Sequence, residues 1–390
     1  MSFDLKNIVR KNIWDLKAYS SARSEFKLYG NESAEKLTLL DANENPNDEK
    51  QNLLNRYPDP LQSDIKKILA EHKEISPDQI FMGNGSDEAI DLLYRIFCEP
   101  EKDRVITCPP TYGMYEVSAA INNVEVLEVP LTNNFELDVD SILNRIKEDK
   151  SIKIIWICSP NNPSGNSLLK ADLPHDWAAE NYTKGGMMDM PFAPQFEREM
   201  LENQRQMDRL FGSFDGIIVV DEAYQDFTEN ISFIKRLEDY PNLVVLQTMS
   251  KAHGLAGVRA GFAYASEEII TLFNKTKPPY NVNMLTQEAV LNALKKTKEA
   301  EKQIIDIKAN RKMLSSVLES LEFVKKVYPS EANFILAEVD NANSLYTYLK
   351  NHGIIVRNRN SQIKNCLRFT VGTDQECEAL IKALKEYNQN

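Results

Sequence analysis

Short apolar runs alternate with stretches of helical hydrophobic spacing over the first two thirds of the 390-residue chain. The apolar runs predict strands at 80–82, 104–108, 124–129, 152–158, 217–220, 243–247 and 260–265. Apolar residues that recur every three or four positions predict helices at 61–71, 89–97, 111–121 and 139–147. Because almost wholly apolar strands flanked by helices are typical of a mainly parallel sheet covered on both faces, we expect an α/β fold.

The pattern changes after residue 280. A long helical region at 286–321 precedes short strands at 323–328, 333–338, 354–357 and 367–370 and helices at 342–351 and 374–387. This change predicts a second, smaller domain. We expect an N-terminal arm and small-domain segment over residues 1–45, a large domain with a mainly parallel seven-stranded sheet over 46–285, and a smaller α/β C-terminal domain over 286–390.

Composition narrows the class of protein. The net charge of −12 and the pI of about 5.1 argue against a nucleic-acid-binding surface. We find no signal peptide and no apolar run long enough to cross a membrane, and the five cysteines lack the spacing of a zinc site. We therefore expect a soluble cytoplasmic enzyme without a metal centre.

Polar side chains follow three of the predicted strands. Asn162 comes after 152–158, Asp221 and Tyr224 follow 217–220, and Lys251 follows 243–247. Ligands of such sheets bind at the carboxyl ends of the strands, so we expect these groups to meet. An amine that forms an imine, a carboxylate facing a pyridine nitrogen, and a phenol and an amide near the ring oxygen are what pyridoxal phosphate chemistry requires.

A phosphate site is predicted beside these groups. Gly85, Ser86 and Asp87 form a turn that opens the helix at 89–97, where free backbone N–H groups suit an anion. We expect Ser86 or Asp87 to cap this helix. Ser250 and Arg259 could bind the same phosphate. Each feature alone also fits an ordinary role, such as a capped helix or an exposed lysine, but their joint occurrence favours a cofactor site.

The motifs resemble a known family. They are YSSAR at 19–23, DANENP at 41–46, RYPDP at 56–60, GNGSDE at 83–88, SPNNPSG at 159–165, VDEAY at 220–224, MSK at 249–251 and LRFTVGT at 367–373. The chain resembles the fold-type I pyridoxal-phosphate-dependent aminotransferases and, within them, the histidinol-phosphate branch. The resemblance implies transamination of L-histidinol phosphate with 2-oxoglutarate in histidine biosynthesis.

The resemblance also implies roles for the matched residues that would hold the cofactor. Lys251 is the imine lysine and then the base at the substrate Cα, and Asp221 pairs with the pyridine nitrogen. Tyr224 and Asn162 contact the ring oxygen. The remaining implied contacts are Tyr112 stacked on the ring, with Ser86, Asp87, Ser250 and Arg259 around the phosphate.

Substrate contacts are implied in the same way. Arg368 would bind the α-carboxylate of glutamate, and Arg357 would help to hold the substrate phosphate beside Asn162. Tyr19 would close over the site, and Tyr57 would arrive from the other subunit of a homodimer. Two guanidinium groups suit a site that must take both carboxylates and phosphate.

Two alternative activities stay open at this point. A lyase that resembles threonine-phosphate decarboxylase, or a broader aromatic aminotransferase, would use much the same residues. A non-catalytic relative would be favoured by the loss of Lys251 or Asp221, and both are present.

One segment departs from the family pattern. Residues 168–213 form a longer connection than we expect between the Asn162 and Asp221 strands, with a charged helical run at 195–210. We interpret the segment as an atypical surface insertion, because loop extensions cost little stability.

Overall fold

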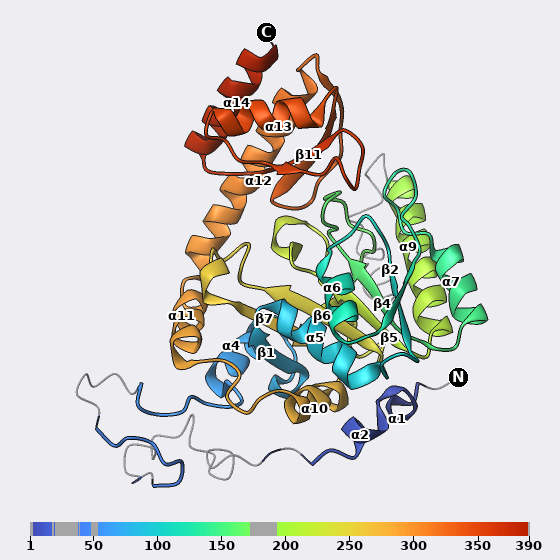
Figure 1. Ribbon diagram of the computed structural model, residues 1–390, viewed down its shortest axis with the longest axis vertical. Coiled ribbons are helices and arrows are strands. Elements are labelled where there is room, and N and C mark those ends of the chain that lie inside the picture. The colour runs from blue at the N-terminus through green and yellow to red at the C-terminus, as the bar shows by residue number, and fades with distance from the viewer. Residues whose placement is uncertain are drawn as a thin grey trace.

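The computed structural model describes residues 3–17, 19, 38, 40–47, 54–171 and 193–388. Two sheets organise the described chain, and a long helix, α12 (Thr297–Glu319), runs from the larger one to the smaller one (Figure 1). No helix in these ranges is long and apolar enough to cross a membrane.

The larger sheet has seven strands in the order β1-β7-β6-β5-β4-β2-β3. Its strands are β1 (Ile80–Asn84), β2 (Arg104–Thr107), β3 (Glu125–Glu128), β4 (Ile152–Cys158), β5 (Ile217–Asp221), β6 (Leu243–Thr248) and β7 (Ala260–Tyr264). The pairs from β3 to β6 are parallel, whereas β7 pairs antiparallel with both β6 and β1. The predicted mainly parallel sheet is confirmed.

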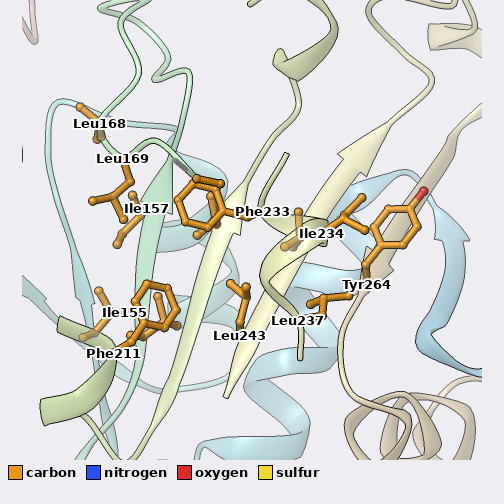
Figure 2. Packing of buried hydrophobic residues seen from close by; sticks show 14 of the residues in the cluster. Ile155, Ile157, Leu168, Leu169, Phe211, Phe233, Ile234, Leu237, Leu243 and Tyr264 are labelled. Carbon is orange, nitrogen blue, oxygen red and sulfur yellow. The ribbon is translucent and has the colours of Figure 1, made fainter. Parts of the chain in front are cut away.

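Alternate residues of the central strands enter two separate apolar layers, as expected for a sheet buried on both faces. Ile155 and Ile157 pack on one face, in the layer of Figure 2, and Ile154 and Trp156 pack on the other. The first face is covered by α4 (Ser63–Lys73), α7 (Val139–Glu148), α9 (Ala193–Ser213) and α11 (Met284–Leu294). The second is covered by α1 (Leu5–Ile8), α2 (Lys11–Trp14), α5 (Ser86–Phe97), α6 (Met114–Ile121) and α10 (Glu267–Thr276).

The smaller sheet is antiparallel, in the order β10-β11-β9-β8. Its strands are β8 (Val324–Val327), β9 (Phe334–Val339), β10 (Arg357–Asn358) and β11 (Cys366–Thr370). The helices α12, α13 (Ala342–Asn351) and α14 (Asp374–Asn388) pack with this sheet around one apolar cluster.

Three local predictions are corrected. The helical region 286–321 is two helices, because the chain turns between Leu294 and Thr297. The strand predicted at 354–357 is reduced to the two residues of β10. Neither Ser86 nor Asp87 caps α5; the cap is Gly85, which has a φ of 76° that glycine adopts without strain.

The prediction that 168–213 is a surface insertion is wrong at both of its ends. Leu168 and Leu169 are buried in the layer of Figure 2, together with Phe211. Helix α9 also buries Met207 and Leu210, because its apolar residues recur at helical spacing and face the sheet. The segment between these ends, 172–192, lies outside the described residues.

Candidate active site

A cavity of about 580 Å³ lies where the carboxyl ends of β4, β5 and β6 face the smaller sheet. It is lined by Ser86, Asp87, Tyr112, Gly113, Met114, Val117, Cys158, Asn162, Asp221, Ala223, Tyr224, Thr248, Ser250, Lys251, Ala256, Arg259, Arg357, Arg359, Gln362 and Arg368. Five of these residues are basic and two are acidic, although the whole chain carries −12. The cavity is therefore suited to an anionic ligand.

Asp221 ends β5 directly beside the end of β4, where its register partner is Cys158. Its side chain is 2% exposed, and its two oxygens accept hydrogen bonds from the Tyr115 hydroxyl at 2.7 Å and the Ala223 N–H at 3.0 Å. Burial raises the pKa of this carboxyl to about 6, while the bond from Tyr115 acts in the opposite direction. The Asp221 carboxylate is therefore held in one orientation, and its negative charge can pair with a cationic group of a ligand.

Lys251 follows β6 and lies over the Tyr224 ring, with Nζ 5.9 Å from the ring centre. Burial lowers its pKa, and the charge of Arg368 adds to that effect, although Asp221 opposes it. A lowered pKa increases the fraction of neutral amine at neutral pH. The lysine is thus suited to act as a nucleophile and as a base.

Asn162 forms hydrogen bonds with cavity residues at both the larger and the smaller sheet. Its amide nitrogen donates to the Tyr224 hydroxyl at 3.3 Å, and its Oδ1 accepts from Arg368 at 2.5 Å and Arg359 at 3.2 Å. Tyr224 also packs edge-on against Phe334 of β9. One amide therefore orients a phenol of the larger sheet and two guanidinium groups of the smaller one.

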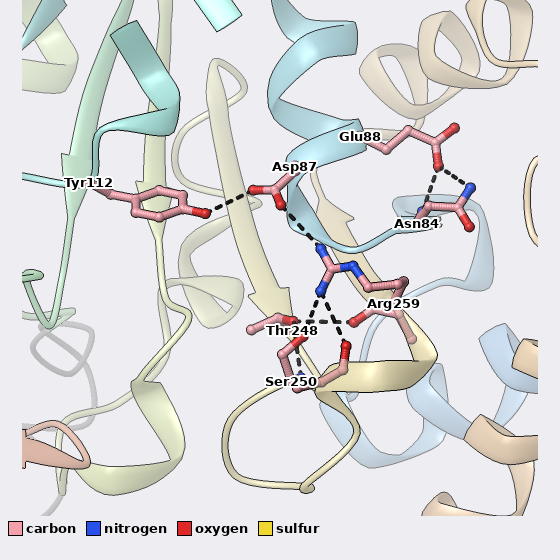
Figure 3. Close-up of polar contacts among 9 residues, drawn as sticks. Asn84, Asp87, Glu88, Tyr112, Thr248, Ser250 and Arg259 are labelled. Carbon is pink, nitrogen blue, oxygen red and sulfur yellow. Dashed lines mark hydrogen bonds and ion pairs between the residues drawn. The ribbon is translucent and has the colours of Figure 1, made fainter. Parts of the chain in front are cut away.

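The turn before α5 meets Arg259 at the opposite side of the cavity. Arg259 donates to Asp87 at 3.1 Å and to Ser250 at 3.4 Å, and Asp87 also accepts from the Tyr112 hydroxyl at 3.1 Å (Figure 3). The start of α5 adds N–H groups and the positive end of a helix dipole. The result is a set of donors of the kind that holds a phosphate.

Arg357 and Arg368 are direct partners across β10 and β11. Arg359, two residues after Arg357, also lines the cavity. Burial and the two neighbouring arginines lower the pKa of Arg359 to about 10. Within the described part of the chain, no carboxylate forms an ion pair with any of the three.

The structure brings most of the predicted site residues together. Those that line the cavity are Ser86, Asp87, Tyr112, Asn162, Asp221, Tyr224, Ser250, Lys251, Arg259, Arg357 and Arg368. Tyr57 and Tyr19 do not line it in this single chain: Tyr57 is 46% exposed and stacks on Tyr280 at 4.5 Å, and Tyr19 is 75% exposed.

Sequence reasoning missed Arg359 and Tyr115. Arg359 could have been noticed, because residues two apart in an extended chain point to the same side, so Arg357 and Arg359 pair naturally. Tyr115 gives no comparable signal. Among the described residues, no group of three His, Cys, Asp or Glu side chains could hold a metal ion.

Similarity to known proteins extends over nearly the whole chain. The family model for aminotransferase class I and II matches residues 29–174 and 203–384. The histidinol-phosphate aminotransferase of Christiangramia forsetii is 48% identical over 386 residues, 98% of each chain, and that of Flavobacterium johnsoniae is 47% identical over 389 residues, 99% of each. The crystal structure of the Clostridium acetobutylicum histidinol-phosphate aminotransferase has a TM-score of 0.69 at 24% identity, and covers 87% of this chain and 92% of that one.

Proposed function

Since the chain belongs to the class I and II aminotransferases and, among them, to the histidinol-phosphate aminotransferase family, we propose that it transfers the amino group between L-histidinol phosphate and 2-oxoglutarate. The products are imidazole-acetol phosphate and L-glutamate, in L-histidine biosynthesis. The observation that carries this proposal is the pairing of Lys251 and Asp221 with three arginines in one cavity. The cofactor is pyridoxal 5′-phosphate.

The residues present fit this cofactor. A Cβ added at Gly85 would lie 2.5 Å from the Arg259 guanidinium. Only glycine therefore leaves enough room for this guanidinium beside the turn. A Cβ at Gly261 would lie 2.1 Å from the Ser86 nitrogen, so this glycine allows β7 to approach the start of α5. The cavity volume is typical of a small-molecule site. Ser86, Ser250 and Arg259 would hold the phosphate.

At the other end of the cofactor site, Asp221 would bind the pyridine nitrogen. Asn162 and Tyr224 would donate to the ring oxygen, and the Tyr112 ring would cover one face of the cofactor. When bound, pyridoxal phosphate supplies an aldehyde that condenses with amines and a ring that accepts the electrons released at the substrate Cα.

Lys251 has two tasks in this proposal. Its amine anchors the cofactor before substrate arrives, and afterwards it moves a proton at the substrate Cα. Both tasks need the unprotonated amine, which the lowered pKa favours at neutral pH. The charge of Arg368 contributes to that lowering, so an anion bound at Arg368 would partly restore the basicity of Lys251.

The three arginines would bind the anionic groups of both substrates. Arg368 would hold the α-carboxylate of glutamate, with its guanidinium oriented by Asn162 and by the Phe334 ring 5.0 Å away. Arg357 and Arg359 would hold the second carboxylate or the phosphate. The Nε atoms of Arg359 and Arg368 are buried without a hydrogen-bond partner among the described residues, which supports an anion as the missing acceptor.

Assembly and location are part of the same proposal. We infer a homodimer in which Tyr57 reaches the cavity of the partner subunit and Tyr19 closes over the substrate. The half-exposed Tyr57 and the exposed Leu61 and Leu285 support an apolar contact surface there. We place the enzyme in the cytoplasm, which fits five buried free cysteines.

A direct assay tests the proposal. Purified protein is supplied with pyridoxal phosphate, histidinol phosphate and 2-oxoglutarate, and glutamate formation is measured. We expect glutamate in amounts that match the consumed 2-oxoglutarate. Release of carbon dioxide from threonine phosphate without glutamate formation would instead establish a lyase and overturn the proposal. Faster turnover of aromatic amino acids than of histidinol phosphate would move the assignment to an aromatic aminotransferase.

A further inference from the structure

Tyr115 lies behind Asp221, outside the cavity. It is the second residue of α6, three positions after Tyr112, which lines the cavity. The Tyr115 side chain is 0% exposed and is absent from the cavity lining. Its hydroxyl reaches Asp221 Oδ2 at 2.7 Å, so a residue outside the cavity lining contacts a carboxylate that lines the cavity.

Packing holds the Tyr115 hydroxyl in place. The ring stacks on Trp156 of β4, with 4.8 Å between centres and 14° between planes, and it meets the Tyr112 ring edge-on at 5.6 Å. The backbone oxygen of Tyr115 accepts the Tyr94 hydroxyl at 2.7 Å. A buried ring with neighbours on several sides has little freedom to turn. The donor is therefore fixed relative to the sheet.

Asp221 depends on this donor. Within the described residues, the hydrogen bonds to its carboxylate come from one backbone N–H, that of Ala223, and one side chain, that of Tyr115. The pKa of Tyr115 is raised by burial and by the charge of Asp221, so the phenol keeps its proton and donates. A donor to a buried carboxylate stabilises the ionised form.

We propose that Tyr115 is a positioning residue that keeps Asp221 ionised and fixes its orientation toward the cofactor nitrogen. This inference rests on the proposed function, because it concerns the same cofactor. Tyr115 acts through Asp221 and touches neither cofactor nor substrate.

Other titratable groups face Asp221 as well. They are Cys158 from β4, Asp87 from α5, Tyr112 before α6, Tyr224 after β5 and Lys251 after β6. The charge of Asp87 raises the pKa of Asp221 and that of Lys251 lowers it, and both contribute less than the Tyr115 bond. The Cys158 thiol is buried, and burial raises its pKa, so it remains neutral at physiological pH. Removing the Tyr115 hydroxyl alone leaves these groups in place.

The test compares Tyr115→Phe with the wild-type protein. Cofactor-free protein is titrated with pyridoxal phosphate from about pH 5 to pH 9, and binding is followed by absorbance. Loss of the donor raises the pKa of Asp221, so the acid midpoint of binding should move up by roughly one pH unit. The dissociation constant at neutral pH should increase about tenfold. The phosphate of the cofactor titrates in the same range in both proteins, so it cancels in the comparison.

Tyr264→Phe is the matched control. It removes one buried hydroxyl from β7, in the apolar layer on the face of the larger sheet opposite to Tyr115. We expect its acid midpoint to equal that of the wild type. A Tyr115→Phe midpoint equal to those of the wild type and Tyr264→Phe would overturn the positioning role while glutamate formation by the wild type still stands. A wild-type protein that neither binds the cofactor nor forms glutamate would overturn the proposed function itself.

Discussion

The two sheets contribute to the cavity in different ways. Groups on the larger sheet are held by near neighbours: Asp221 by Tyr115 and by Ala223, and Ser250 by Thr248. Arg368 on β11 and Arg359 just after β10 share the acceptor Asn162 Oδ1, and in the described part of the chain their Nε atoms have no acceptor. Asp221 and Ser250 are thus held by hydrogen bonds from residues beside them, whereas the Arg359 and Arg368 Nε donors lack acceptors that an anion would supply.

This difference predicts which of the cavity residues can be substituted with little loss of activity. A group fixed by several short bonds loses its function when it is replaced, because no neighbour can move into its place. A set of three similar cations can share one anion, so the loss of a single member is partly compensated.

The largest effect is expected for Lys251→Ala. Loss of the amine removes both the cofactor anchor and the base, so turnover should fall by about 10⁴-fold, the upper range for a positioned base. The measurement is the initial rate of glutamate formation. Lys298→Ala, on the exposed side of α12, should retain wild-type activity. A Lys251→Ala protein within tenfold of the wild type would remove the lysine from the proposed chemistry.

Arg368→Gln tests the substrate half of the contrast. The substitution keeps a polar side chain and removes the charge, and a hydrogen bond to a charged group contributes roughly 1.5–3 kcal/mol. We expect kcat/KM for glutamate to fall about 10- to 100-fold, with cofactor affinity unchanged. Steady-state kinetics and a cofactor titration measure the two quantities. An equal loss in cofactor affinity would mean that Arg368 affects cofactor binding as much as substrate binding, so the two parts of the cavity do not act independently.

Arg359→Gln and Arg357→Gln form a matched pair, since Arg357 begins β10 and Arg359 directly follows it. Arg359 is partly buried and bonded to Asn162, whereas Arg357 is exposed. We therefore expect KM for histidinol phosphate to increase about tenfold in Arg359→Gln and less in Arg357→Gln. A larger increase in KM for Arg357→Gln would instead support the sequence prediction, in which Arg357 helps to hold the substrate phosphate and Arg359 has no role.

Much of the cofactor half could be predicted from sequence, because Asn162, Asp221 and Lys251 each follow an apolar strand. Parallel strands bring such positions to one edge of the sheet whatever the exact register. Arg359 was missed because its place depends on the short β10 strand, whose start was predicted three residues too early. Tyr115 was missed because its partner is 106 residues away and only the packed structure joins them. The helix α9 was misread as surface because it lies in a segment without family motifs.

The smallest effect is expected at the junction of the two sheets. Glu331, just before β9, accepts hydrogen bonds through Oε2 from Thr228 at 2.9 Å, from Asn230 at 2.6 Å and from Ser167. Glu331→Gln removes the charge from this cluster, and the lost charged bonds should lower the free energy of unfolding by about 1–2 kcal/mol, which is a Tm lower by a few degrees.

Thermal denaturation of the cofactor-free protein measures this change, with Glu319→Gln at the exposed end of α12 as the control for charge alone. Because Glu331 contacts neither Asn162 nor the arginines, kcat should change less than threefold. A large loss of kcat without a change in Tm would instead mean that the junction sets the position of the arginines over the cofactor half. Substrate binding would then depend more on how the two sheets are held together than on the number of arginines in the cavity.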